Sequence, residues 1–591
     1  MLKNTNCKQL DIFTETSYHR IPKKHILLKI NSAISLQFVN DLLAESYCVN
    51  FGRPAYSPEQ MVRISIVQKL YDLSDENVMD EIAVNRAMEW FCGFSPIDNL
   101  PHPSTLCKFR TLRLLNTSVD EIMTEIVRQC IDRKLIESDN GVAIDTTHIE
   151  ANCVKKVPER IMSELTKRIF REQQKECPAL PDWENTEDHQ GAKQQLKEIL
   201  EDAVQNAPMK TKSVCEAEEV LRDPMFIAQK GVRSLQDKDA RVGNKTKEKQ
   251  FFGYKTEFIM TTKSKIITAV TVQPGNYRDG NEANALIRQT MKSGLEPKHF
   301  CGDKSYFRPD ILNKLDEIHA VPYIPVSACS YRINEERFAY QKDTDQWICC
   351  MGNESVSKKH IRTGRGPAYQ YTFQKEQCRN CLLRKECIGT AGGIAKRLHV
   401  GLHTSELYEY SQWTKTEAFL DGYRLRAAIE PKNAELKRFH GLARAKGYGL
   451  KSITLQAKLT AIAVNLKRIV KLLNEKQKET ASLYCTILQK AISFFNYLSV
   501  VCKQVSLIRR RSPFYSFYPY FFSGLEPSLC HRKSRRDLHR FNCRSRSDSA
   551  TANDSPFCTC YRDRAPLSNR EALPPLRGSR SFRRRRRGGG P

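Results

Sequence analysis

Apolar residues recur at helical spacing through the first part of the chain. The peptide Ser-Pro-Glu at 57–59 is a typical helix start, and apolar positions follow it at intervals of three and four. A second helix is predicted from the turn at 73–76 to Trp90, and a third begins after a proline-rich break, where Ser104 can cap it. Residues 1–130 are therefore predicted to form an all-α N-terminal domain. Such short helices suit DNA binding, but generic helical packing gives the same pattern.

Beyond this domain the pattern changes to runs rich in β-branched and aromatic residues. A strand is predicted at 141–149, a hairpin at 251–261 and 265–272, and a short strand at 298–301 after a helix at 281–291. This order of elements is typical of a mixed sheet with helical cover, so the predicted fold class is α/β.

Two insertions interrupt the predicted sheet domain, which spans residues 131–475. The first, at 153–250, is charged and helical, and the second, at 326–410, contains six cysteines. A helical segment at 415–475 completes the domain, and a helical extension follows at 476–508.

The net charge of the chain is +28 over 591 residues, which points to a polyanion as partner and disfavours an enzyme for acidic metabolites. Half of that charge lies in residues 509–591, which contain 20 basic and 6 acidic residues, nearly all of the basic ones arginine. This tail lacks apolar periodicity, so we expect it to be disordered. It is either a basic nucleic-acid arm, a nuclear-import signal, or no evolved module at all, for instance the product of a shifted reading frame.

No membrane partner is expected. The start of the chain lacks the apolar run of a signal peptide, and the most apolar late stretch, 482–501, is interrupted by Gln489, Lys490 and Asn496. Without a signal peptide, the 21 cysteines are expected to be mostly reduced thiols.

Two aspartates follow predicted apolar strands. Asp145 ends one apolar run and Asp303 follows another, so both can lie at neighbouring strand ends. Carboxylates in that position are natural ligands for a hard divalent cation. Each aspartate alone is more often a turn or capping residue.

Four polar residues share a helical spacing near the end of the sheet domain. Tyr423, Arg426, Glu430 and Lys437 stand at offsets 0, 3, 7 and 14, which places them within roughly 60° on one helical face. A solvated face with charge pairs is the alternative. Pro431 is expected to kink or restart the helix directly after Glu430, which makes the position of Lys437 relative to the others less secure.

The spacing Tyr-x2-Arg-x3-Glu-x6-Lys resembles the signature of bacterial insertion-sequence transposases of the DDE class. Asp145 in AIDTTHIEAN, Asp303 in GDKSY and Glu430 match the three carboxylates of that family in order. The resemblance covers roughly residues 15 to 475, and its further matches are GYK at 253–255, PGNYRDG at 274–280, NLKRIVKLL at 465–473, and FGRPAYSPEQM and PHPSTLCKFR in the helical head.

The resemblance implies an RNase H-like core in which Asp145, Asp303 and Glu430 hold two Mg²⁺ ions. It implies cleavage at the terminal inverted repeats of a mobile element and strand transfer into target DNA, by a homo-oligomer on double-stranded DNA in the bacterial cytoplasm. Tyr423, Arg426 and Lys437 would contact DNA or orient the carboxylates. The alternatives are a catalytically inactive, transposase-derived DNA-binding protein and a structure-specific nuclease on the same fold, which the signature and the separate head disfavour.

The cysteines of the second insertion are candidate metal ligands. Cys350, Cys378, Cys381 and Cys387 could supply the four thiolates of a structural Zn²⁺ site, and buried or merely reduced thiols are the alternative. His148 and His440 are predicted not to be ligands: His148 alternates away from Asp145 in a regular strand, and His440 lies beyond the expected kink.

Overall fold

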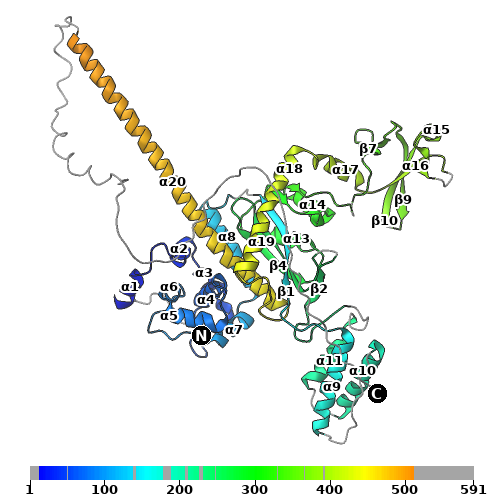
Figure 1. Ribbon diagram of the computed structural model, residues 1–591, viewed down its shortest axis with the longest axis horizontal. Helices are drawn as coiled ribbons and strands as arrows, with labels where there is room; N and C mark the ends of the chain where they lie inside the picture. Colours follow the sequence, from blue (N-terminus) through cyan, green and yellow to red (C-terminus); the bar gives the residue numbers. More distant parts are fainter. Residues whose placement is uncertain are drawn as a thin grey trace, which may run out of the picture. The chain divides into compact units, whose positions relative to one another are not determined.

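In the computed structural model the described residues are 12–48, 51–137, 141–176, 188–206, 211–224, 231–245, 248–328, 331–364, 366–389 and 393–511 (Figure 1). The chain divides into two units, Met1–Ser493 and Phe494–Pro591, and the candidate site lies within the first. The predicted Arg-rich tail falls outside the described residues from position 512 onward.

The described part of the chain before residue 137 contains helices. They are α1 (Ile12–His19), α2 (Ile26–Ala33), α3 (Phe38–Leu42), η1 (Ala44–Ser46), α4 (Pro58–Leu70), α5 (Asp75–Val84), α6 (Arg86–Phe91), α7 (Pro103–Leu112) and α8 (Asn116–Asp132). Their apolar faces share one hydrophobic core with the central sheet.

The predicted start of α4 is confirmed. The Ser57 side chain accepts a hydrogen bond from the backbone N–H of Gln60, and the Gln60 side chain accepts one from the backbone N–H of Ser57. This capping box, with Pro58 at the first helical position, satisfies backbone donors that the helix leaves free.

Two predictions in this region are wrong in detail. The helix expected up to Trp90 is two helices, because Asn85 takes an extended conformation that ends α5 and caps α6 by accepting from the backbone of Ala87 and Met88. The cap of α7 is His102 rather than Ser104. Pro103 has no N–H to offer and suits the first helical position, so the cap lies at His102, two residues earlier than predicted.

A mixed sheet forms the centre of the molecule, as predicted. Its strands are β1 (Val142–Glu150), β2 (Arg241–Asn244), β3 (Gln250–Thr261), β4 (Ile267–Pro274), β5 (His299–Cys301) and β6 (Val321–Tyr323). The order is β2-β3-β1-β5-β6, and β4 pairs with β3. The β1–β3 and β3–β4 pairs are antiparallel, whereas β1–β5 and β5–β6 are parallel.

Helices cover this sheet. They include α8, α13 (Ala283–Lys292), α14 (Pro309–Glu317) and the first part of α20 (Leu450–Arg511). Asn465 ties α20 to the sheet, because its side chain accepts from the backbone N–H of Ile267 at 2.8 Å and donates to the carbonyl of the same residue at 2.6 Å. An amide that meets both groups of one β4 residue fixes the helix at a single position along the strand.

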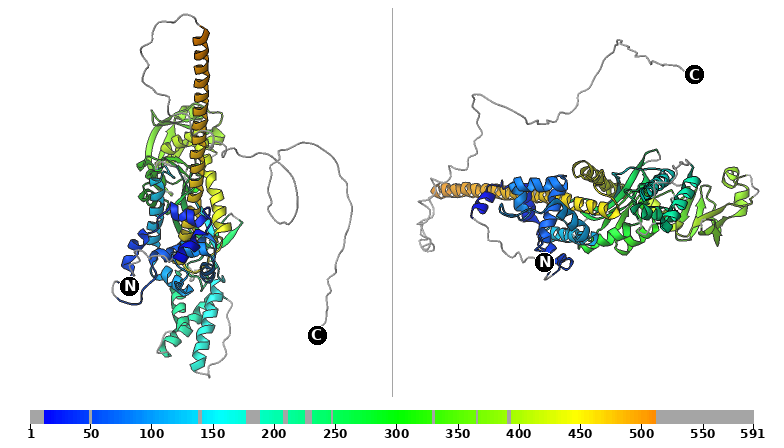
Figure 2. Two further views of the ribbon diagram at one scale, coloured as in Figure 1. Left: turned by 90° about the vertical axis from the view of Figure 1, so that its left-hand side faces the viewer. Right: turned by 90° about the horizontal axis from the view of Figure 1, so that it is seen from below.

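In its described residues, the first insertion contains a bundle of three helices with its own apolar core (Figure 2). They are α9 (Pro158–Glu176), α10 (His189–Asn206) and α11 (Lys212–Arg222). The predicted boundary at residue 250 is too late, because β2 at Arg241–Asn244 already pairs with β3 as part of the central sheet.

The second insertion also has its own core, which is built on two small sheets. Its elements are β7 (Phe338–Gln341), β8 (Gln346–Cys349), β9 (Ser355–Thr363), β10 (Gly366–Phe373), α15 (Lys375–Arg379), α16 (Arg384–Ile388) and β11 (Arg397–Gly401). The chain then returns to the sheet through α17 (Thr404–Trp413), α18 (Glu417–Arg424), η3 (Leu425–Ala428) and α19 (Ile429–Phe439).

Helix α20 changes character along its length. Its first turns are buried in the main core, whereas most side chains described from residue 477 onward are exposed. By length and composition alone, this helix is long and apolar enough to cross a membrane, and none of the qualifying stretch is buried. The polar residues Gln489, Lys490 and Asn496 therefore do not by themselves exclude this helix from those that are long and apolar enough to cross a membrane.

Candidate active site

Asp145 and Asp303 lie side by side at the end of a short parallel ladder. Val142 of β1 is opposite Phe300 of β5, and Ala143 is opposite Cys301. Each aspartate follows its last paired residue by two positions, so both extend from the same end of the ladder. Strand β1 continues to Glu150 against β3 alone, so Asp145 lies within its strand rather than at the end of it.

Asp145 is held by two side chains from the segment that follows α18. Asn433 of α19 donates a hydrogen bond from Nδ2 to Asp145 Oδ2 at 2.8 Å, and the Arg426 guanidinium lies 3.6 Å from Oδ1. The side chain is 16% exposed. Burial raises the pKa of this carboxyl, and the nearby charge of Asp303 adds to the rise, while Arg426 and the hydrogen bonds oppose it.

Arg426 connects Asp145 to the third predicted carboxylate. Its Nη1 atom lies 3.9 Å from Glu430 Oε1, and its Nη2 atom lies 3.6 Å from Asp145 Oδ1. Glu430 is 71% exposed, so its carboxylate is free to turn on the solvent side of the site. In the described residues, no three Asp, Glu, His or Cys side chains stand close enough together to hold a metal ion, and Arg426 is the cation that Asp145 and Glu430 share.

The expected restart of the helix occurs before Glu430 rather than after it. Tyr423 is in α18, Arg426 is in the 3₁₀ turn η3, and α19 begins at Ile429 with Pro431 in its first turn. Proline is tolerated there because the first N–H groups of a helix have no intrahelical partner. The four signature residues therefore lie on three consecutive helical pieces, and the Tyr423 ring stacks on Phe419.

Lys437 lies one turn beyond Asn433 and contacts a different residue of β1. Its Nζ atom is 3.1 Å from Nδ1 of His148. Burial lowers the pKa of Lys437 to about 8 and that of His148 to about 4, so the imidazole is neutral at neutral pH and accepts this hydrogen bond. The structure thus places Lys437 beside His148 rather than beside the carboxylates.

The two histidines have protein partners of other kinds. The His148 ring also packs on Phe251 with ring centroids 5.0 Å apart. His440 is buried, and its Nδ1 lies 3.0 Å from the backbone carbonyl of Lys69 in α4. Neither of these contacts joins the histidines to the carboxylates.

Glu257 is a buried carboxylate beside the site that the sequence prediction missed. It lies in β3 opposite Thr146 and accepts hydrogen bonds from the Tyr277 hydroxyl at 2.9 Å and the Gly280 N–H at 2.8 Å. Tyr306 completes the group, since its hydroxyl lies 2.9 Å from Thr146 Oγ1. Burial raises the pKa of Glu257.

These contacts give a structural reason for three of the motifs in the sequence. Lys255 of the GYK motif pairs with Asp279 at 2.9 Å and donates to the Tyr277 carbonyl at 3.0 Å. Tyr277, Asp279 and Gly280 belong to PGNYRDG, and Tyr306 belongs to GDKSY, so the first loop is anchored on β3 and the second on β1, next to Asp145. Glu257 is the one acidic residue of β3 and directly precedes its apolar run at 258–260, and this was the available signal.

The predicted zinc ligands are only partly brought together. Cys378, Cys381 and Cys387 line one cavity, but the fourth cysteine on its wall is Cys349, and Cys350 is exposed. Successive side chains of an extended segment point to opposite sides, so at the end of β8 only one of two adjacent cysteines can face the cavity.

The donor set at Asp145, Asp303 and Glu430 fits a divalent metal. Carboxylate oxygens are the ligands that Mg²⁺ prefers, and a largely buried carboxylate such as Asp145 is costly to ionise without a cation. For these carboxylates to bind the metal, Arg426 would have to leave its position between Asp145 and Glu430, and the Glu430 side chain would have to turn inward.

Comparison with known families finds two matches. A transposase domain (DUF772) matches residues 15–112, and a transposase DDE domain matches residues 348–470. The first covers the helical head as far as α7, and the second runs from the end of β8 into α20 and includes Glu430. No curated protein matches the chain.

Among solved structures, the chain is similar to one described as the cryo-EM structure of a piggyBac transposase synaptic complex with hairpin DNA. The identity is 8% and the TM-score 0.27, over 76% of this chain and 79% of that one. A TM-score this low supports no conclusion about fold or site. The two family matches carry the assignment, because they lie at the helical head and at the segment bearing the last carboxylate. Together they support a transposase of the DDE type.

Proposed function

We propose that this transposase cleaves DNA strands at the terminal inverted repeats of its element and transfers them to target DNA, with Asp145, Asp303 and Glu430 as the catalytic carboxylates. One observation carries the proposal: Asp145 and Asp303 lie at the same end of the β1–β5 ladder, and Arg426 joins Asp145 to Glu430. Asp145 and Glu430 come from distant parts of the sequence and share one arginine, and Asp303 extends from the same end of the ladder as Asp145, which supports a common role for the three.

We also propose that the central sheet is an RNase H-like core. An antiparallel set, β4-β3-β1, continues into the parallel strands β5 and β6, and α8, α13 and α20 cover it. This arrangement supports the assignment, since Asp145 lies in β1 and Asp303 follows the adjacent strand β5 by two residues.

Two Mg²⁺ ions would supply Lewis-acid stabilisation of the attacking and leaving oxygens of a phosphodiester when bound to the three carboxylates. The side chains around them have separate tasks. Asn433 keeps the Asp145 carboxylate in one orientation, and Arg426 can move from the carboxylates to a DNA phosphate, which a guanidinium binds well. Lys437 and Tyr423, which belong to the same sequence signature as Glu430, are proposed to contact the DNA backbone.

The function is tested with the purified full-length chain and DNA fragments that span each end of its element. Nicking at the element ends is expected with Mg²⁺ and is expected to stop when EDTA is added, and the products should carry 3′-hydroxyl groups. Cleavage that continues in EDTA, or a covalent protein–DNA adduct, would contradict the mechanism. Binding without any cleavage would favour the catalytically inactive DNA-binding protein instead.

Replacing Arg426 by Gln is expected to move the acid limb of the cleavage rate to higher pH. The guanidinium lowers the pKa of Asp145, so its loss raises that pKa further, and the metal-binding carboxylate is protonated at a higher pH as the solution is acidified. The measurement is the pH dependence of cleavage at saturating DNA. Arg438→Gln, on an exposed position of α19, is the control and should leave the acid limb in place.

A further inference from the structure

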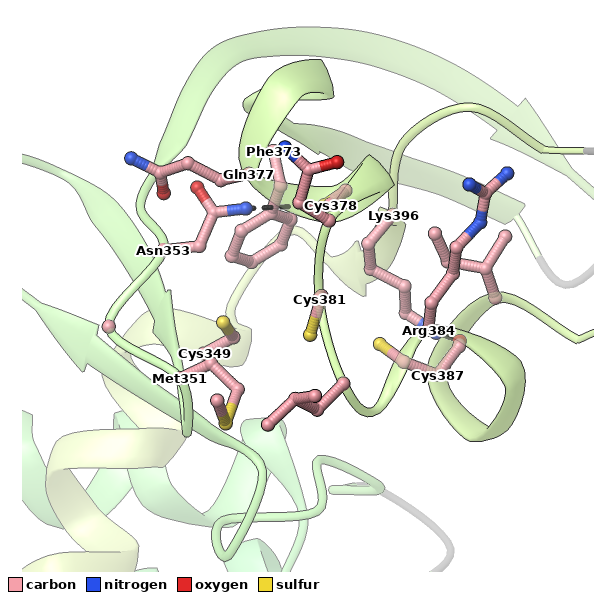
Figure 3. Close-up of a pocket in the computed structure, with 14 residues that line it drawn as sticks. Cys349, Met351, Asn353, Phe373, Gln377, Cys378, Cys381, Arg384, Cys387 and Lys396 are labelled. Carbon is pink, nitrogen blue, oxygen red and sulfur yellow. Dashed lines mark hydrogen bonds between the residues drawn. The ribbon is translucent and has the colours of Figure 1, made fainter.

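Four cysteines from three segments line one cavity in the second insertion. In the sequence these cysteines lie between Asp303 and Glu430 and are well separated from both. The volume of the cavity is about 390 Å³. Cys349 ends β8, Cys378 is in α15, Cys381 is in the turn after it, and Cys387 is in α16. Figure 3 shows the sulfur atoms of Cys349, Cys381 and Cys387 facing the same space.

The electrostatics of Cys387 connect all four thiols. Burial raises the pKa of Cys387 most, and the charges of Cys349, Cys378 and Cys381 also raise it, so each of these three thiols lies within interaction range of Cys387. Four thiolates cannot coexist in such a space without a cation, and a soft ligand set of this kind selects zinc among the common metals.

Groups around the thiols suit their charged form. Asn353 Nδ2 donates a hydrogen bond to Cys378 Sγ at 3.2 Å, and this contact fixes the direction of the side chain, as an outer partner does for a metal ligand (Figure 3). Lys396 and Arg384 also line the cavity, and the Lys396 charge lowers the pKa of Cys387. A four-thiolate zinc site has a net charge of −2, which these two cations would offset.

The backbone turns at this site are local and compact. Gly352 has a φ of 75° and donates its N–H to the Cys349 carbonyl at 2.8 Å, closing the turn that follows β8. On the other wall, the Arg384 N–H bonds to the Cys381 carbonyl at 3.2 Å, and the Cys387 N–H bonds to the Leu383 carbonyl at 2.9 Å. The thiols therefore lie on short segments whose main chains are already closed by hydrogen bonds.

We propose that Cys349, Cys378, Cys381 and Cys387 bind one structural Zn²⁺ ion, which joins β8 to the α15–α16 segment. In the described residues the thiols are not yet at ligand distance from a common point, so the ion would draw their side chains inward from the walls of the cavity. Tetrahedral coordination by four thiolates at about 2.3 Å would then replace most of the open space between them. The site would hold together the small module formed by β7 to β11, which has its own core.

The test uses the full-length chain purified under reducing conditions. The parent is expected to contain one zinc ion per chain, and replacement of that ion by Co²⁺ should give the visible absorption of tetrahedral cobalt with thiolate charge-transfer bands. Cys349→Ser and Cys381→Ser should each lose the metal and the spectrum. Cys350→Ser is the matched control, because it changes the adjacent exposed cysteine, and it should keep both.

Several outcomes would overturn the site. One is a parent chain that contains no zinc and takes up no Co²⁺ after reduction, and another is a disulfide between two of the four cysteines in the purified protein. Full retention of metal by Cys349→Ser would place the ion elsewhere, for example on the cysteines of the C-terminal segment. If Cys349→Ser fails to fold, the cobalt-substituted parent provides the test instead, because the intensity of its thiolate charge-transfer bands reports how many thiolates bind the metal. Fewer than four thiolates would contradict the proposal.

Discussion

Asp145→Asn, Asp303→Asn and Glu430→Gln are each expected to lower DNA cleavage by about 10⁴-fold while DNA binding persists, because groups that act as one catalytic unit fail together when any one is removed. Each change keeps the size of the side chain and removes the charge that a divalent metal requires. Asn at 145 can still accept the hydrogen bond from Asn433, so the loss should come from the missing charge rather than from a collapsed site.

Cleavage is measured on labelled DNA spanning an element end, and binding is measured by mobility shift. Asp421→Asn is the control, since Asp421 is exposed in α18 and pairs only locally, with Arg424 at 2.6 Å. It should cleave like the parent. If one of the three carboxylate variants retained parental cleavage, that residue would have no part in catalysis and the assignment of the triad would be wrong.

Glu257→Leu is expected to lower the free energy of unfolding of the central domain by several kcal/mol and to weaken cleavage as well. The change leaves the Gly280 N–H and the Tyr277 hydroxyl without their acceptor, and a buried donor without a partner costs about 1–3 kcal/mol. Because these donors hold the PGNYRDG loop on β3 beside Thr146, the strand that carries Asp145 should lose support too.

The variant Glu257→Gln tests the role of the carboxyl charge while the shape of the side chain is kept. The amide keeps one acceptor and the same volume, so a much smaller loss is expected than for leucine. The raised pKa of Glu257 means that its protonated form is favoured in the fold, so its contribution to stability is present below the unfolded pKa and is lost as the pH rises through the folded pKa. Glutamine does not titrate, so the stability of this variant relative to the parent should improve as the pH rises.

Thermal unfolding at several pH values checks both variants. Glu296→Gln, at an exposed position, is the control and should stay within about 0.5 kcal/mol of the parent. A leucine variant as stable as the parent would show that the hydrogen-bond group around Glu257 contributes nothing to the fold.

Much of the element order was predictable from the sequence because it depends on local patterns. The Ser57 capping box, the strand that contains Asp145, and the hairpin that became β3 and β4 are all signalled by residues within a few positions of each other. Boundaries were less secure where one residue decided them: Asn85 divided a predicted helix, and β2 was hidden inside a charged segment because four residues are too few to show a period.

The sequence motifs and their resemblance to those of DDE transposases also identified Asp145, Asp303 and Glu430 as candidates, since a motif is a local property of the chain. Tertiary structure decided which side chains meet: Arg426 with two carboxylates, Lys437 with His148, and Cys349 rather than Cys350 with the other thiols. The physical reason is that a contact between distant segments depends on strand register and on where a helix restarts. Here the β1–β5 ladder shows the strand register, and α19 restarts before Pro431. The spacing of the residues in the sequence encodes neither the register nor the position of this restart.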